Sequence, residues 1–94
     1  MKCKGLGGYK MVTLLGHGLT SSVRYMLESM PEGFSLAMRV YMLTHESNLL
    51  FHGVTNCDQS PDGYWLAVAY YQDGKQEVHV FRQEDIGDIR VFYE

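Results

Sequence analysis

The sequence predicts one small α+β domain, in which a short N-terminal helix precedes a five-stranded antiparallel meander, folded as a curved sheet or a small barrel. Three observations predict this class. The chain has 94 residues, 46% of them apolar, which suffices for one modest core but not for two. The spacing of apolar residues changes from a helical period to a period of two near Gly33. An Asp-Gly dipeptide then separates two alternating segments, a strong hairpin signal.

The first third of the chain predicts a lead-in and the helix. Residues 1–8 hold three glycines and two lysines, typical of a flexible segment before a single domain over residues 9–94. We expect a short strand over residues 9–15 and a helix from Thr20, where hydroxyl side chains can cap a first turn. Pro31 and Gly33 end this helix, whose apolar stripe must pack on the sheet: Val23, Met26, Leu27 and Met30.

Two strands and a loop are predicted next. Residues 34–43 place an apolar side chain at every second position, which predicts a long strand with one buried face. A second strand is expected over residues 49–55, where Gly53 marks a bend or a bulge. Residues 56–63, with the sequence NCDQSPDG, are expected to form the main loop.

The last third predicts a hairpin and a closing strand. Strands over residues 64–72 and 76–82 are joined by Asp73-Gly74, a pair typical of tight hairpin turns. A helical or 3₁₀ turn is expected over residues 83–87. The fifth strand then covers residues 88–93.

A helix followed by five antiparallel strands, with a single helical turn between the fourth and fifth, resembles the Sm-like small barrels over residues 20–93. The family's sequence motifs differ in this chain. Its Asp-apolar-x-Asn motif stands here as Gly53-Val54-Thr55-Asn56, and its Arg-Gly pair as Arg82-Gln83. The resemblance therefore implies the fold without the residues by which that family binds RNA.

Charge is divided unevenly along the chain. Residues 1–45 carry five basic and two acidic residues, a net charge of +3, whereas residues 46–94 carry three basic and nine acidic ones, a net charge of −6. A charge distribution of this kind bears on partners rather than on fold. It favours a protein partner with a basic surface and disfavours nucleic acid, whose phosphates need a basic groove.

The sequence lacks the signals of a membrane span, an export signal and a CxxC metal site. No run of 18 apolar residues is present, so we expect no membrane span, and the apolar run after Met11 is too short for an export signal. Cys3 and Cys57 are far apart in sequence, which excludes a CxxC metal site and favours reduced thiols in the cytoplasm. No metal and no cofactor are predicted.

The strand over residues 64–72 is apolar on both faces. One helix can cover only one of these faces, so the other either closes into a barrel or meets another chain. The candidate partner-binding residues are the aromatic residues of this strand and the acidic residues after the hairpin: Tyr64, Trp65, Tyr70, Tyr71, Glu84, Asp85 and Asp88.

These features predict a small non-enzymatic binding or regulatory protein that acts through protein–protein contacts, with a homo-oligomer, preferably a dimer, as its assembly. One specific form is an inhibitor encoded by a virus or mobile element, which occupies its target's nucleic-acid site by charge mimicry. The alternative is a small-barrel nucleic-acid-binding protein that stacks bases on Tyr and Trp and contacts phosphates with Lys2, Lys4, Lys10, Arg24 and Arg39.

Other chemistry has less support in the sequence. Gly16-His17-Gly18 precedes the helix, whose N-terminal amides attract anions, but a hinge is the simpler interpretation. The four histidines lack the short spacings of a zinc site. Cys57 has the residue type of a nucleophile, His52 or His79 that of its base, and Asp58 that of an orienting carboxylate, but nothing in the sequence fixes their geometry. No catalytic residue is therefore assigned.

Overall fold

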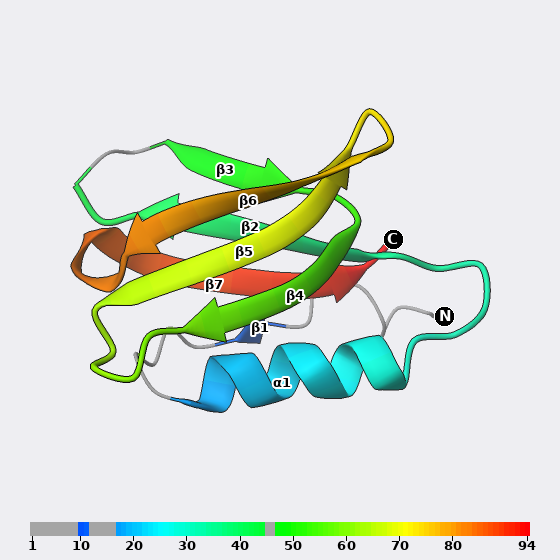
Figure 1. Cartoon of the computed structure of the whole chain (residues 1–94), viewed down its shortest axis with the longest axis horizontal. Coiled ribbons are helices and arrows are strands. Elements are labelled where there is room, and N and C mark those ends of the chain that lie inside the picture. The colour runs from blue at the N-terminus through cyan, green and yellow to red at the C-terminus, as the bar shows by residue number, and fades with distance from the viewer. Residues whose placement is uncertain (1–9, 12–16, 45–46) are drawn as a thin grey trace.

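The computed structural model describes residues 10–11, 17–44 and 47–94. These residues contain one α-helix and antiparallel strands in two sheets, which confirms the α+β class (Figure 1). The predicted lead-in over residues 1–8 lies outside the described residues. Of the strand predicted over residues 9–15, the described part is β1, Lys10–Met11.

The helix α1 spans His17–Glu28, so it begins three residues before the predicted start at Thr20. Val23 and Met26 of the predicted stripe are buried, as is Leu19, and Leu27 and Met30 pack partly buried against the core, which confirms the stripe. The last turn of the helix is closed by a hydrogen bond from the Ser29 N–H to the Tyr25 carbonyl. Pro31 follows shortly after, and its ring cannot continue a helix. The helix packs against β4, Val54–Gln59 (Figure 1).

The first sheet has the strand order β1-β7-β2-β3, in which β7 and β2 form the long central pair. Its strands are β7 (Ile86–Tyr93), β2 (Leu36–Met42) and β3 (Asn48–Phe51), besides β1. β2 corresponds to the predicted alternating strand, and its core-facing residues Leu36, Met38 and Val40 are fully buried.

The segment expected to be one strand over residues 49–55 forms two strands in different sheets. β3 ends at Phe51, and β4 begins at Val54, after Gly53 with φ of +62°. The expected loop over residues 56–63 is wrong for its first half, because β4 continues to Gln59 and buries Cys57. A register shift between Val54 and Asn56 interrupts the period of two, which hid this strand from the sequence pattern.

The second sheet has the order β4-β5-β6, with β5 at Trp65–Gln72 and β6 at Lys75–Arg82. The predicted hairpin is confirmed: Gln72 pairs with Lys75 across the two-residue turn. Asp73 and Gly74 have φ of 56° and 78°, the two positive values of a type I′ turn. The predicted 3₁₀ turn is also present at Gln83–Asp85 and leads directly into β7.

The core lies between the two sheets and α1. It draws buried apolar side chains from α1 and from every strand after β1, including Val23, Met38, Phe51, Cys57, Leu66, Phe81 and Ile89. The buried polar side chain Gln83 accepts a hydrogen bond of 2.7 Å from the Gln59 amide, which ties the turn after β6 to β4. The sheet faces that point away from this core are the places where a functional surface can form.

Candidate functional site

The two faces of β5 differ sharply in exposure. Leu66 and Val68 point into the core and are 1% and 0% exposed, whereas Trp65 and Tyr71 face outward and are 44% and 51% exposed. Tyr70 lies on the core side, where its ring centroid is 4.8 Å from that of Phe51. The candidate aromatic residues of this strand are therefore not all on one face.

β6 adds two valines to the outward face of β5. The register pairs Val80 with Ala67 and Val78 with Ala69, and directly opposite residues of antiparallel strands share a face. Val78 is 59% exposed and Val80 is 54% exposed. We call this surface the outer face and define it by six residues: Trp65, Ala67, Ala69, Tyr71, Val78 and Val80.

The sequence prediction missed both valines. The signal was available, because the Asp-Gly turn fixes the β5–β6 register and thereby sets Val78 and Val80 beside the alanines of β5. Tyr64, which was predicted, precedes β5 and packs edge-to-face on Trp65 with a centroid distance of 4.8 Å. The exposed apolar side chains of the outer face make it the candidate interaction surface.

The predicted acidic residues lie near the end of β6, beside a basic residue. The Arg82 guanidinium is 3.5 Å from a Glu84 carboxylate oxygen and 3.4 Å from one of Asp85. A hydrogen bond to the Tyr64 hydroxyl and the charge of Asp85 raise the pKa of Arg82. Asp88 is half-buried in β7, where its carboxylate accepts a hydrogen bond of 2.9 Å from the Ile89 N–H. Arg82 thus offsets part of the acidic charge at this corner.

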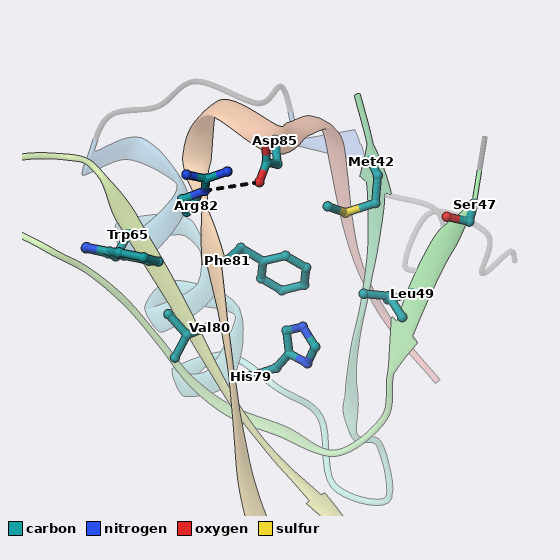
Figure 2. A pocket seen from close by; sticks show the side chains of 9 residues that line it. All are labelled: Met42, Ser47, Leu49, Trp65, His79, Val80, Phe81, Arg82 and Asp85. Carbon is teal, nitrogen blue, oxygen red and sulfur yellow. Dashed lines mark ion pairs between the residues drawn. The ribbon is translucent and has the colours of Figure 1, made fainter. Parts of the chain in front are cut away.

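A groove follows β6 next to the outer face. Figure 2 shows Trp65 and Val80 on one side of the β6 ribbon and Phe81 and His79 on the other. The Arg82–Asp85 ion pair stands at one end (Figure 2). We call this space, of about 540 Å³, the β6 groove, and its lining is Met42, Ser47, Leu49, Trp65, His79, Val80, Phe81, Arg82 and Asp85.

Known proteins do not identify this surface: no protein-family model, curated protein or solved structure matches the chain. In the part of the chain that the structure describes, no helix is long and apolar enough to cross a membrane. A functional proposal therefore rests on the outer face and the β6 groove, which adjoin and share Trp65 and Val80.

The residues of the thiol hypothesis lie in different environments. The Cys57 side chain is 1% exposed, and burial, helped by the charge of Asp58, raises the pKa of its thiol to about 12. His52 lies at the surface, where its Nδ1 is 2.6 Å from a Glu94 carboxylate oxygen. Among the described residues, no three His, Cys, Asp or Glu side chains gather closely enough to hold a metal ion.

Proposed function

We propose that this chain is a small, non-enzymatic cytoplasmic binding protein that acts through protein–protein contacts at the outer face, with a dimer as its favoured assembly. The observation that supports this proposal is the exposure, between 44% and 59%, of Trp65, Tyr71, Val78 and Val80 on one face of one sheet. Covering each side chain contributes about 1 kcal/mol, since roughly half of it is already buried. Covering all four side chains offsets part of the free-energy cost of association.

The acidic charge adds a preference for a basic partner surface. Residues 46–94 carry a net charge of −6, and this half of the chain contains the outer face. Complementary charge speeds encounter and selects partners more than it strengthens binding. Glu84 and Asp85 project beside the β6 groove and share Arg82, so a basic side chain of the partner would compete with Arg82 for them. An inhibitor encoded by a virus or mobile element, acting by charge mimicry, is one form of such a regulator.

Trp65→Ser is expected to weaken self-association about tenfold or more, because Trp65 belongs to both the outer face and the β6 groove. Sedimentation equilibrium over a wide concentration range measures the dissociation constant of the wild type and the variant. The matched control is Tyr25→Ser, which removes an aromatic ring that is 69% exposed on α1, away from the outer face. A wild type that stays monomeric at the highest concentration, or equal weakening by both substitutions, would contradict the proposal.

One observation favours the nucleic-acid alternative. Across the first sheet, Arg90 on β7 is the register partner of Arg39 on β2, which sets two basic residues in one row. Like charges directly opposite each other destabilise a sheet, and a phosphate backbone would relieve that repulsion. The Arg90 guanidinium also lies 5.4 Å from the Tyr41 ring centroid, so an aromatic ring adjoins the row.

Under this alternative, Arg90→Glu lowers the affinity for a single-stranded RNA oligonucleotide about tenfold at low salt, because a phosphate contact is replaced by repulsion. Filter binding at low and high salt measures this effect. Lys75→Glu, the same charge change at the β5–β6 turn, is the control and should have a smaller effect. Absence of RNA retention by the wild type at low salt would eliminate the alternative.

We further propose that the two sheets are halves of one five-stranded meander that curves into a small Sm-like barrel. In support, β3 and β4 are separated only by His52 and Gly53, so they can act as one bent strand. The first and last long strands, β2 and β7, are paired. An experimental structure in which residues 48–59 run as one bent strand, giving the continuous order β7-β2-β3/β4-β5-β6 with the edge of β6 left open, would establish this meander.

A further inference from the structure

β6 is the longest strand with an unpaired edge in the described part of the chain. It has eight residues, pairs with β5 along its whole length without a register shift, and has no second strand partner among the described residues. The other sheet edges differ: β3 has four residues, β1 has two, and β4 contains a register shift and packs against α1. An exposed, regular edge strand is a template for pairing with another chain.

The middle of this edge lacks the features that keep edge strands apart. Natural edges are protected by lysine, proline, bulges or short length. β6 carries Lys75 and Glu77 near its start and Arg82 at its end, but the segment 78–80 between them reads Val-His-Val. This central part therefore combines free backbone groups with exposed apolar side chains.

The β6 groove has the form that an added strand requires. Successive side chains of a strand point to opposite faces, so an incoming strand needs apolar contacts on both sides of the edge. Trp65 and Val80 supply them on the outer side, and Phe81 and Leu49 supply them on the inner side (Figure 2). The space therefore suits an extended chain with apolar residues at alternate positions.

We propose that a second copy of this chain occupies the β6 groove, its β6 pairing antiparallel with the first β6 about a two-fold axis at His79. This inference rests on the self-association proposed above and specifies its strand and its register. The two three-stranded sheets join into one six-stranded sheet. A two-fold axis perpendicular to the sheet keeps each face on its own side, so the two outer faces merge into one apolar surface. The second copy covers the groove side of Trp65 and Val80, and the rest of the merged surface stays open to the proposed partner.

The axis at His79 makes the strand complementary to itself. Directly opposite residues share a face, and only every second residue of a strand lies on that face. Each residue of β6 must therefore lie opposite one that is an even number of positions away from it in the sequence. With the axis at His79, Val78 lies opposite Val80 of the second copy, and the reverse pair follows by symmetry. All four exposed valines then form cross-strand β-branched pairs, which stabilise a sheet. Gln76 faces Arg82 of the second copy, Glu77 faces Phe81, and the two His79 side chains meet on the axis.

Neighbouring axes fit less well. An axis at Glu77 places two carboxylates directly opposite each other, which is destabilising. An axis at Val78 sets Val80 against Gln76, and an axis at Val80 sets Val78 against Arg82. Each of these leaves one exposed valine of every copy facing a polar side chain.

Disulfide crosslinking tests both the strand and the register. In a Cys3→Ser background, we expect purified Val78→Cys and Val80→Cys proteins to form a disulfide-linked dimer when they are mixed and mildly oxidised. Each variant alone should remain uncrosslinked, because its thiol faces a valine of the second copy. Opposite Cα atoms lie about 4.5 to 5.5 Å apart in antiparallel pairs, within the range of a disulfide. Cys57 is 1% exposed and does not compete.

The outcomes separate this inference from the proposed function. Crosslinking of either variant alone would overturn the register. A wild type that sediments as a dimer, together with a mixture that does not crosslink, would overturn the β6 pairing and leave self-association standing. Crosslinking of the mixture with no effect of Trp65→Ser on dimerisation would support the edge and refute the role of Trp65. In a cell extract, crosslinks to a different protein with none between copies would assign the groove to a heterologous strand.

Discussion

Leu66→Ala is expected to lower the free energy of unfolding by about 2–5 kcal/mol. Leu66 is 1% exposed and lies on the core side of β5, opposite Phe81 of β6 and Gln59 of β4. Alanine loses the transfer free energy of the removed methyl and methylene groups and leaves a cavity between the sheets. Small domains have total stabilities of about 5–15 kcal/mol, so this one change removes a large share. Urea unfolding followed by far-UV circular dichroism measures it.

Leu43→Ala is the matched control, since it makes the same chemical change at a side chain that is 64% exposed. Its expected cost is below about 0.5 kcal/mol, as for most surface substitutions. Similar losses in the two variants would mean that the inner face of β5 is not the core face. The outer-face assignment of Trp65 and Tyr71 would then fail as well, because it depends on the same alternation.

The parts of the fold that the sequence predicts correctly depend on local rules. The alternation along β2 predicts its buried face, because successive side chains of a strand point in opposite directions. The Asp-Gly turn predicts both the β5–β6 hairpin and its turn type, since few residue pairs accept two positive φ values. The helix stripe predicts its buried side, although the helix begins earlier than its best capping residues indicate.

The parts that sequence reasoning misses depend on contacts between distant residues. Sequence reasoning misses β4 because its bulge leaves two consecutive residues, Thr55 and Asn56, exposed. This break in the alternation is typical of a loop. The division of residues 49–55 between two sheets is equally non-local, because Phe51 pairs with β2 whereas Val54 pairs with β5. No local pattern shows such a pairing.

The candidate site was predicted in part for the same reason. Trp65 and Tyr71 follow from the two-sided apolarity of their own strand, whereas Val78 and Val80 require the register with the neighbouring strand. The net charge of the sequence does not show that Glu84 and Asp85 are paired. The Arg82 guanidinium lies 3.5 Å from a Glu84 carboxylate oxygen and 3.4 Å from one of Asp85. The single β5–β6 hairpin supplies both the outer face and the free edge, so one local signal, the Asp-Gly turn, positions most of the proposed site.

Cys57 is expected to react with a thiol reagent about a thousandfold more slowly in the folded protein than in the unfolded chain, where a cysteine has its ordinary pKa of 9.0. Burial raises that pKa to about 12, and only the thiolate attacks such reagents. Below pH 9 the thiolate fraction therefore falls about tenfold for each unit of the shift, before access is considered. Alkylation of the Cys3→Ser protein at pH 8, with and without urea, measures the ratio. A folded-state rate equal to the unfolded one would revive the hypothesis that Cys57 is a nucleophile.

The raised pKa of Cys57 makes the free energy of unfolding depend on pH above about pH 9. The folded thiol binds its proton more tightly than the unfolded thiol, so its contribution is fully present below pH 9 and declines as the pH rises from 9.0 toward about 12. At pH 10 the expected loss is about 1.4 kcal/mol relative to pH 7. Cys57→Ala lacks the titrating group, so the difference in unfolding free energy between wild type and variant should shrink by that amount from pH 7 to pH 10. Tyrosine titration is common to both proteins and cancels in this comparison. A difference independent of pH would show that Cys57 ionises in the folded state as freely as in the unfolded chain, and would contradict the raised pKa.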